Sequence, residues 1–565
     1  MIIKMNYQLE SIQDPKVVAI RERGTASGML FTCAFALPHT SIHPESSSTR
    51  GSSKQGLDIP IQRRVDAGRR SKRGDISGSV GVGNNADVLY TVPIELGSEV
   101  VAVNLDTGSS DLWVVSDACQ TGTCQNSKVP RYPSSSIRPA GADVQMFYGD
   151  STSGTFASGT IARDTATIAG VAMTDQAFGA INSTSNAIVQ FNTAGIFGLG
   201  FPSGSKVQES LVTKQFGPIV DTDNFIQATY DNGPLLTRIT MTEELEMPMF
   251  TITLQRSTID IGGTGLLTIG KLPDGIDNSS LTWVPVRLYS VENGGLKAPT
   301  FAPDEVYPFR WEIDIDGVFL DGQKVPDSTI PASGVNPGRV SALIDTGNSI
   351  LRGPEDMVNT ILRTVSPTFD STTANAKAVV PCAVPHTVAF QIGGKMFPVD
   401  PRDFIGELQD NDATNCVADN IVSTDPPRIG SLYSWSLGDP FLKSNLVAFH
   451  YGNLTHPSVD PPRIGFLSTV PANADDLLKQ AVADAQNNGG NFEETLVVAP
   501  TASAAAAGQI TVSGAKPTST VTTTVPGASP SSDPNLNNGN KSNSALSTHL
   551  FDIWAYTIPL LTLLL

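Results

Sequence analysis

The stretch Val101-Ala-Val-Asn-Leu-Asp106-Thr107-Gly108-Ser109-Ser110 contains a tripeptide, Asp-Thr-Gly, that the chain uses twice. The second copy lies in Val340-Ser-Ala-Leu-Ile-Asp345-Thr346-Gly347-Asn348-Ser349. Each aspartate follows a short apolar run of the kind that forms a buried strand, and each glycine allows a sharp turn just after the carboxylate. The two copies indicate either a duplicated site or two unrelated strand-to-turn junctions.

The chemical interpretation of the repeat is a pair of carboxylates. If two halves of the chain pack symmetrically, the two loops bring Asp106 and Asp345 together. Two carboxylates in contact cannot both ionise cheaply, so they hold one proton between them. Such a pair contains a base that can remove a proton from water and an acid that can protonate a carbonyl oxygen. This chemistry hydrolyses an amide without a metal, and we expect no cofactor.

Composition limits the classes of protein that fit. The chain has 565 residues, of which 40% are hydrophobic and 16% charged, with a net charge of −18. The net negative charge belongs to the chain after residue 73, because basic residues outnumber acidic ones in the first 73 residues. An acidic, lysine-poor body argues against nucleic acid as a partner and suits a protein that works in acid, where many carboxylates are neutral.

The pattern between residues 76 and 470 predicts a mostly β protein. Short alternating runs such as Val88–Ile94, Phe250–Leu254 and Leu266–Ile269 are separated by Gly, Pro, Asn and Asp. Long amphipathic helices are scarce; the better candidates are 359–365 and the stretch around 223–245.

Both ends of the chain differ in composition from this body. We expect residues 1–73 to form a leader, with a weak apolar core at 29–37, and a basic pro-segment that is cut after Lys72-Arg73. Residues 471–548 are predicted to form a stalk rich in Ser, Thr and Ala, mainly disordered, with one short helix at 473–487. Residues 549–565 match a GPI-attachment signal, with a tail anchor as the alternative.

Five cysteines are present, and one of them, Cys33, lies in the expected leader. Pairing of near neighbours among the others gives Cys119–Cys124 and Cys382–Cys416. Metal binding is the rival interpretation, although no histidine accompanies these cysteines at zinc-finger spacing. Sequons for N-glycosylation begin at Asn182, Asn278, Asn453 and Asn540, as expected of a secreted surface.

Several motifs, in order, resemble those of the pepsin-like aspartic proteases over roughly residues 85–470. Asp106-Thr-Gly-Ser-Ser-Asp-Leu-Trp113-Val114 is similar to the family's first active-site strand, and Tyr148-Gly149-Asp150 to the tip of its flap, the hairpin that closes over the substrate. Ile196–Gly200 and Leu437–Phe441 resemble the two apolar-glycine strands beside the catalytic loops. The two cysteine pairs fall where the family has two of its disulfides.

The resemblance implies a bilobal β fold with the active-site cleft between an N-terminal lobe, 74–275, and a C-terminal lobe, 276–470. It also implies an aspartic endopeptidase in which Asp106 and Asp345 are catalytic, polypeptides are the substrates and the protein is a monomer. The supporting roles follow from the same likeness: Thr107 and Thr346 brace the loops, Ser109 bonds Asp106, Trp113 supports Tyr148, and Gly108 and Gly347 leave room for water and substrate. With its pro-segment, stalk and tail, the chain resembles the GPI-anchored yapsin-type members at the cell surface.

The chain departs from the family pattern at a few positions. Asn348 stands where the family usually has a hydroxyl residue that donates to the second catalytic aspartate. We expect the Asn348 amide to bond Asp345 in a slightly different geometry, so that Asn348→Ala raises the pKa on the acid limb of the pH profile. The alternative is that Asn348 points away from Asp345. Ser436 is a second departure, in the second apolar-glycine strand.

Two other functions compete with peptide hydrolysis on this fold. One is a catalytically inactive binding or inhibitor protein, and the other is a structural wall glycoprotein held by its anchor. Inactive relatives usually lose an aspartate or the flap tyrosine, whereas Asp106, Asp345 and Tyr148 are all present here.

Overall fold

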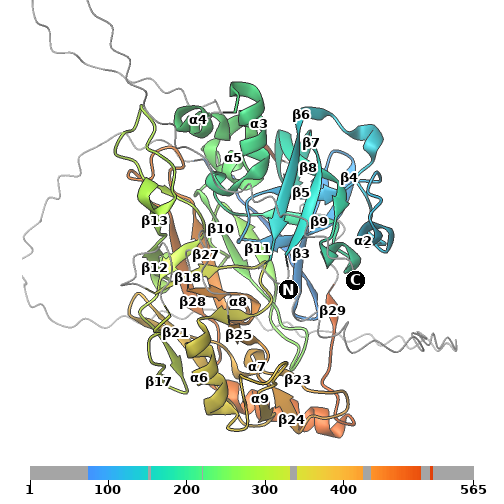
Figure 1. The fold of residues 1–565 in the computed structure, drawn as a ribbon, viewed down its shortest axis with the longest axis vertical. Coiled ribbons are helices and arrows are strands. Elements are labelled where there is room, and N and C mark those ends of the chain that lie inside the picture. Colours follow the sequence, from blue (N-terminus) through green and yellow to red (C-terminus); the bar gives the residue numbers. More distant parts are fainter. Residues whose placement is uncertain are drawn as a thin grey trace, which may run out of the picture. The chain divides into compact units, whose positions relative to one another are not determined.

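The computed structural model describes residues 74–149, 154–218, 221–330, 340–423, 434–497 and 510–512. The expected leader and pro-segment, the flap residue Asp150 and the C-terminal segment 549–565 lie outside these residues. Within them the chain is mostly β-sheet, as its short alternating runs predict (Figure 1). The strands form two lobes joined by a shared sheet.

The first lobe is built on a ten-stranded sheet with the order β29-β2-β3-β4-β9-β5-β8-β7-β6, and β30 pairs with β8. The long strands β6, β7 and β8 form two successive antiparallel pairs. The β7–β8 turn has positive φ at Ala169 and Gly170, which matches the right-handed twist of a hairpin. The strands are β2 Gly83–Asn85, β3 Leu89–Leu96, β4 Glu99–Asp106, β5 Leu112–Val115, β6 Pro139–Tyr148, β7 Thr155–Ile168, β8 Val171–Thr184, β9 Gly195–Gly198, β29 Leu496–Val497 and β30 Ile510–Val512.

The second lobe contains smaller sheets, of which the order β15-β18-β26-β19-β25 carries the second Asp-Thr-Gly loop. The other sheets have the orders β17-β16-β21-β22, β20-β24-β23 and β13-β14. Their strands are β13 Leu288–Tyr289, β14 Tyr307–Pro308, β15 Glu312–Asp314, β16 Gly317–Leu320, β17 Gln323–Lys324, β18 Ser341–Ile344, β19 Leu351–Gly353, β20 Val379–Pro381, β21 Val388–Ile392, β22 Lys395–Pro398, β23 Gly406–Glu407, β24 Asn415–Val417, β25 Ile421–Ser423 and β26 Trp435–Leu437.

A six-stranded sheet with the order β1-β11-β10-β27-β28-β12 joins the lobes. Its middle pair, β10 and β27, comes from distant parts of the chain. Beside it, the buried rings of Trp311, Phe250, Phe449 and Tyr451 pack together, and both Trp311 Nε1 and Tyr451 Oη donate to the Leu199 carbonyl. The two lobes therefore share one aromatic core. The strands are β1 Gly78–Gly81, β10 Met249–Thr253, β11 Leu266–Ile269, β12 Thr282–Pro285, β27 Asn445–His450 and β28 Arg463–Ser468.

The same strand arrangement carries both Asp-Thr-Gly loops. In the first lobe β4 runs parallel to β9, and β5 pairs with β9 in the antiparallel sense. In the second lobe β18 runs parallel to β26, and β19 pairs with β26 in the antiparallel sense. Each loop therefore connects two strands that flank a common third strand, and this repeat gives the two aspartates equivalent positions.

Helices cover the sheets and confirm the sequence predictions of helical segments. The stretch around 223–245 contains α4 and α5, 359–365 falls within α6, and 473–487 matches α9. None of the helices in the described part of the chain is both long and apolar enough to cross a membrane. The helices are α2 Gly122–Gln125, α3 Lys206–Phe216, α4 Thr222–Asn232, α5 Leu235–Met241, α6 Glu355–Val365, α7 Pro401–Phe404, α8 Asp439–Ser444 and α9 Ala474–Asn487, with 3-10 turns at Ser134–Ser136, Ala187–Gln190, Pro202–Gly204, Asn278–Ser280 and Val291–Asn293.

The segment after β28 corrects the prediction that a stalk begins at residue 471. Helix α9 packs against α7 of the second lobe and buries Leu478 and Val482. The chain then crosses to the first lobe, where β29 pairs with β2 (Figure 1). Further along the chain, β30 pairs with β8. The compositional shift near 470 marks the end of the alternating β pattern, but the apolar face of α9 still has a partner to bury against.

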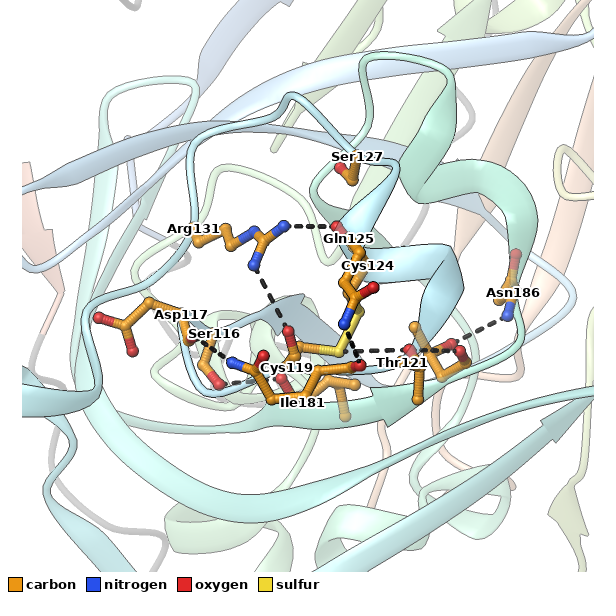
Figure 2. The surroundings of a disulfide bond; sticks show 12 residues. Ser116, Asp117, Cys119, Thr121, Cys124, Gln125, Ser127, Arg131, Ile181 and Asn186 are labelled. Atoms are coloured by element: carbon orange, nitrogen blue, oxygen red, sulfur yellow. Dashed lines mark hydrogen bonds between the residues drawn. A yellow bond between two sulfur atoms is a disulfide. The ribbon is translucent and has the colours of Figure 1, made fainter.

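Both predicted disulfides, Cys119–Cys124 and Cys382–Cys416, are confirmed. Figure 2 shows the first, in the loop that follows β5. The Arg131 guanidinium donates to the carbonyl oxygens of both Cys119 and Cys124, and Thr121 Oγ1 donates to the Thr184 carbonyl at 2.9 Å. These contacts tie the loop to the sheet that carries Trp113.

Candidate active site

The threonines of the two Asp-Thr-Gly loops bond each loop to the other. Thr107 N–H donates to Thr346 Oγ1 at 3.1 Å, and Thr346 N–H donates to Thr107 Oγ1 at 3.0 Å. Each hydroxyl in turn donates across the lobes, from Thr107 to the Ile344 carbonyl and from Thr346 to the Leu105 carbonyl. This two-fold set of four hydrogen bonds is buried, and it fixes the aspartates that precede the threonines at the interface of the lobes.

The carboxyl groups of Asp106 and Asp345 face each other across the two glycines. A Cβ atom built on Gly108 would lie 2.5 Å from Asp345 Oδ1, and one built on Gly347 would collide with Asp106 Oδ1. Any side chain at these positions would therefore push one carboxyl group away. This packing gives the Asp-Thr-Gly spacing a steric reason, since the glycine of each loop makes space for the aspartate of the other.

The two carboxyl groups receive different numbers of hydrogen bonds. Asp106 Oδ1 accepts from the N–H groups of Gly108 and Ser109, at 2.9 and 3.2 Å, and its Oδ2 accepts from Ser109 Oγ at 2.5 Å. Asp345 Oδ1 accepts from Gly347 N–H at 2.9 Å. Donors stabilise the ionised form of a carboxyl group, so this arrangement favours the charge on Asp106 and the proton on Asp345.

Burial and mutual repulsion act on the same pair. Burial and the neighbouring Asp106 carboxylate, acting against the hydrogen bond from Gly347 N–H, together raise the pKa of Asp345 to about 7. Burial also raises the pKa of Asp106, while its three donors oppose that effect. The pair therefore keeps a shared proton well above the pH at which an exposed aspartic acid ionises.

The structure overturns the expectation that Asn348 donates to Asp345. The Asn348 Nδ2 group donates to Ser436 Oγ at 2.9 Å instead, and the backbone N–H of Asn348 donates to the Asp345 carbonyl. The longer amide reaches past the carboxyl group to the neighbouring strand β26. The position of Ser436 was noted in the sequence, but nothing there linked it to Asn348, since the two residues meet only through strand pairing.

Two of the predicted flap residues lie in the antiparallel pair of strands β6 and β7, where Tyr148 ends β6 and Gly149 follows it. Trp113 Nε1 donates to Tyr148 Oη at 2.8 Å, which is the support expected of Trp113. Burial raises the pKa of Tyr148, and the charges of Asp111 and Asp106 raise it further, so the phenol remains neutral. Gly149 has φ of 84°, a conformation that favours glycine at the turn of the flap.

Sequence reasoning gave no role to Asp111, which holds the end of the first loop. Its carboxylate accepts from Ser205 Oγ at 2.5 Å and from the backbone N–H of Lys206 at 2.7 Å, at the start of α3. Burial raises the pKa of Asp111 to about 6 against these donors. A carboxylate at a helix N-terminus is a common capping arrangement, and here the bonds cross from the loop to α3.

The comparisons with known proteins agree with this geometry. A two-lobed β fold with one Asp-Thr-Gly loop from each lobe defines the class of aspartic proteases. The sequence profile of the eukaryotic aspartyl proteases matches residues 89–456, and the chain belongs to this family. It is an aspartic-type endopeptidase, a hydrolase.

The similar curated proteins are proteases from fungi and animals. An "Aspartic protease" of Phaffia rhodozyma is 26% identical over 414 residues, covering 72% of this chain and 83% of that protein. "Cathepsin E-A" of Xenopus laevis is 27% identical over 395 residues, covering 69% and 81%. "Major aspartyl peptidase 1" of Cryptococcus neoformans is 24% identical over 433 residues, covering 73% and 75%.

Proposed function

We propose that Asp106 and Asp345 are the catalytic residues and hydrolyse peptide bonds by general acid and base catalysis with an activated water. The observation that carries this proposal is the pair of facing carboxyl groups, held by four threonine hydrogen bonds and unequally supplied with donors. Asp106 is the base because its donors stabilise the charge, and Asp345 is the acid because it retains the proton.

The reaction then follows from the positions of the two protons. Asp106 takes a proton from water as the water oxygen adds to the substrate carbonyl carbon, and Asp345 gives its proton to the carbonyl oxygen. The resulting tetrahedral diol collapses when Asp106 gives its new proton to the amide nitrogen, Asp345 takes a proton from one of the diol hydroxyl groups and the C–N bond breaks, which yields a carboxyl group and an amine. Because the dyad ends the cycle with one proton, it is ready for another substrate.

The substrate we propose is an extended polypeptide that lies beneath the flap formed by β6 and β7. An extended chain can hydrogen-bond a hairpin through its main chain, while its side chains enter pockets on either side. Tyr148, fixed by Trp113 and kept neutral, would form the inner surface of this hairpin. Digestion of casein at acid pH, with and without pepstatin, tests the proposal: we expect cleavage that pepstatin abolishes.

The same assay separates hydrolysis from a binding or inhibitor function. A protein that binds pepstatin but releases no peptides would be an inactive relative. The presence of both aspartates and Tyr148 in one arrangement favours hydrolysis. A structural role alone would leave the protein without pepstatin binding.

We also propose that the protein is a glycosylated, GPI-anchored enzyme of the cell surface, similar to the yapsin-type members, and that it is made as a zymogen cut after Lys72-Arg73. Two sequon residues, Asn182 and Asn278, are exposed and therefore accessible to glycosylation. The residues of the attachment signal lie outside the described part. Deleting residues 549–565 should release the protein into the medium, whereas a truncated protein that stays with the cells would exclude this signal as the anchor.

A further inference from the structure

The two catalytic loops have the same pattern, Asp-Thr-Gly followed by a polar residue, but that fourth residue bonds a different partner in each. In the first loop Ser109 Oγ donates to the carboxylate of Asp106 at 2.5 Å. In the second loop the corresponding Asn348 donates to Ser436 Oγ at 2.9 Å. The first aspartate therefore has a side-chain donor, and the second has its backbone donor from Gly347.

Two further contacts hold Asn348 in this orientation. Ile350 N–H donates to Asn348 Oδ1 at 3.3 Å, and a backbone N–H can only donate, so the side-chain oxygen must face it. The amide NH₂ is thereby directed to Ser436. The Asn348 carbonyl accepts from Asp439 N–H at 2.9 Å, next to Gly438, whose missing side chain allows this close approach.

The strand register shows that the hydroxyl group occupies a different position in each half. Ser436 on β26 pairs with Leu343 on β18, and the corresponding pair in the first half is Ile196 on β9 with Asn104 on β4. In the first half the hydroxyl is on the loop, at Ser109, and the strand residue is apolar. In the second half the hydroxyl is on the strand, at Ser436, and the loop residue is an amide directed toward it.

We propose that Asn348 and Ser436 form a positioning pair. Because the Asn348 amide donates to Ser436, it does not donate to Asp345, and the dyad retains its shared proton at higher pH. This inference rests on the proposed catalytic role of Asp345 and extends it. The pair also ties the second loop to β26, so the loop that carries Asp345 is held without a side-chain hydrogen bond to the Asp345 carboxyl group.

Charged and titratable side chains on the surrounding elements stay the same in the test described below. Asp106 faces Asp345 directly and raises its pKa. Asp439, at the start of α8, is buried and has a pKa well above its usual value, so it adds no charge in acid. The other groups on the elements around the loop are Lys443 on α8, Arg310, Glu312 and Asp314 on and beside β15, Arg352 on β19 and Tyr148 on the flap.

The direction of the expected shift depends on the proton whose loss each limb of the pH profile reports. The active form has one proton, so the alkaline limb of kcat/KM reports the loss of that proton from Asp345. A new donor to the Asp345 carboxylate would stabilise its ionised form and lower this pKa. The alkaline limb should then move to lower pH.

The test restores the first-half arrangement in the second half through Asn348→Ser combined with Ser436→Ala. Alanine is chosen over isoleucine at 436 because a larger side chain could overpack this buried position. We expect the alkaline limb of kcat/KM, measured with a fluorogenic peptide from pH 2 to 8, to move by about 1 pH unit toward acid, the effect of one hydrogen bond to a charged group. Asn348→Thr, which leaves Ser436 in place, should move the alkaline limb in the same direction. This single variant replaces the double variant in the test if the double variant does not fold.

Two comparison variants separate donation from structural disturbance. Asn348→Ala removes the bond to Ser436 but no donor to Asp345, so its alkaline limb should stay at the parent position even if kcat falls. Ser109→Ala removes a donor to Asp106 and should move the acid limb to higher pH. Superimposable alkaline limbs for the parent, the double variant and Asn348→Thr would overturn the inference. A parent protein with no pepstatin-sensitive activity would instead overturn the proposed function on which it rests.

Discussion

Truncating Leu478 in α9 tests whether the segment after residue 470 is part of the peptidase fold. The Leu478 side chain is 0% exposed, within the same hydrophobic core as both lobes. Replacing a buried leucine by alanine removes its transfer free energy and leaves a cavity, which together cost about 2–5 kcal/mol. Because α9 is a single helix at the surface of the lobe and can partly relax, we expect Leu478→Ala to lower the free energy of unfolding by about 3 kcal/mol.

The assay is urea unfolding of the full chain at acid pH, followed by tryptophan fluorescence and by loss of peptidase activity. Lys479→Ala is the matched control, since this neighbouring side chain is exposed and its change should stay within about 0.5 kcal/mol. If 471–497 were a detached stalk, Leu478→Ala and Lys479→Ala would leave the unfolding midpoint equally unchanged. That result would refute the docking of α9.

Three other perturbations have defined outcomes. Burial raises the pKa of Glu312 to about 7. The protonated side chain therefore stabilises the fold below about pH 5, and this contribution is lost as the pH rises through 7. Glu312→Gln should reduce the difference between the urea unfolding midpoints at pH 4.5 and 7.5. Replacing Cys382 and Cys416 by alanine opens a loop of 34 residues and should cost about 3–4 kcal/mol in urea unfolding. Lys443→Ala leaves the buried carboxylates of Asp87 and Asp403 without their shared cation and should cost about 3–5 kcal/mol, whereas a change under 1 kcal/mol would show that the remaining groups compensate.

The alternating apolar runs predicted the strands, the repeated tripeptide and the family resemblance predicted the facing loops, and the proximity of the cysteines predicted their pairs. Each Asp-Thr-Gly follows an apolar strand, and symmetric packing of the two halves was expected to bring the aspartates together. The contact of Trp113 with Tyr148 was also expected, because the resemblance to the pepsin-like proteases implies it.

Features that depend on contacts between distant segments were not predictable from the sequence. The direction of the Asn348 amide depends on Ser436, which approaches only through the pairing of β18 with β26. The docking of α9 and β29 depends on surfaces supplied by both lobes, and the polar composition beyond residue 470 indicated a stalk. The buried contact of Lys443 with Asp87 joins opposite ends of the domain and has no local signature.

The kinetics of two single substitutions test the account's central claim most directly. Asp106→Asn and Asp345→Asn each preserve the size of the side chain but remove either the base or the acid of the dyad, so kcat/KM at acid pH should fall by about 10³-fold or more. Asp117→Asn, at a carboxyl group outside the dyad that bonds Ser134, is the control and should retain activity. Circular dichroism should show that all three proteins are folded. Activity within about tenfold of the parent in either dyad variant would contradict the assignment of Asp106 and Asp345 as the catalytic pair.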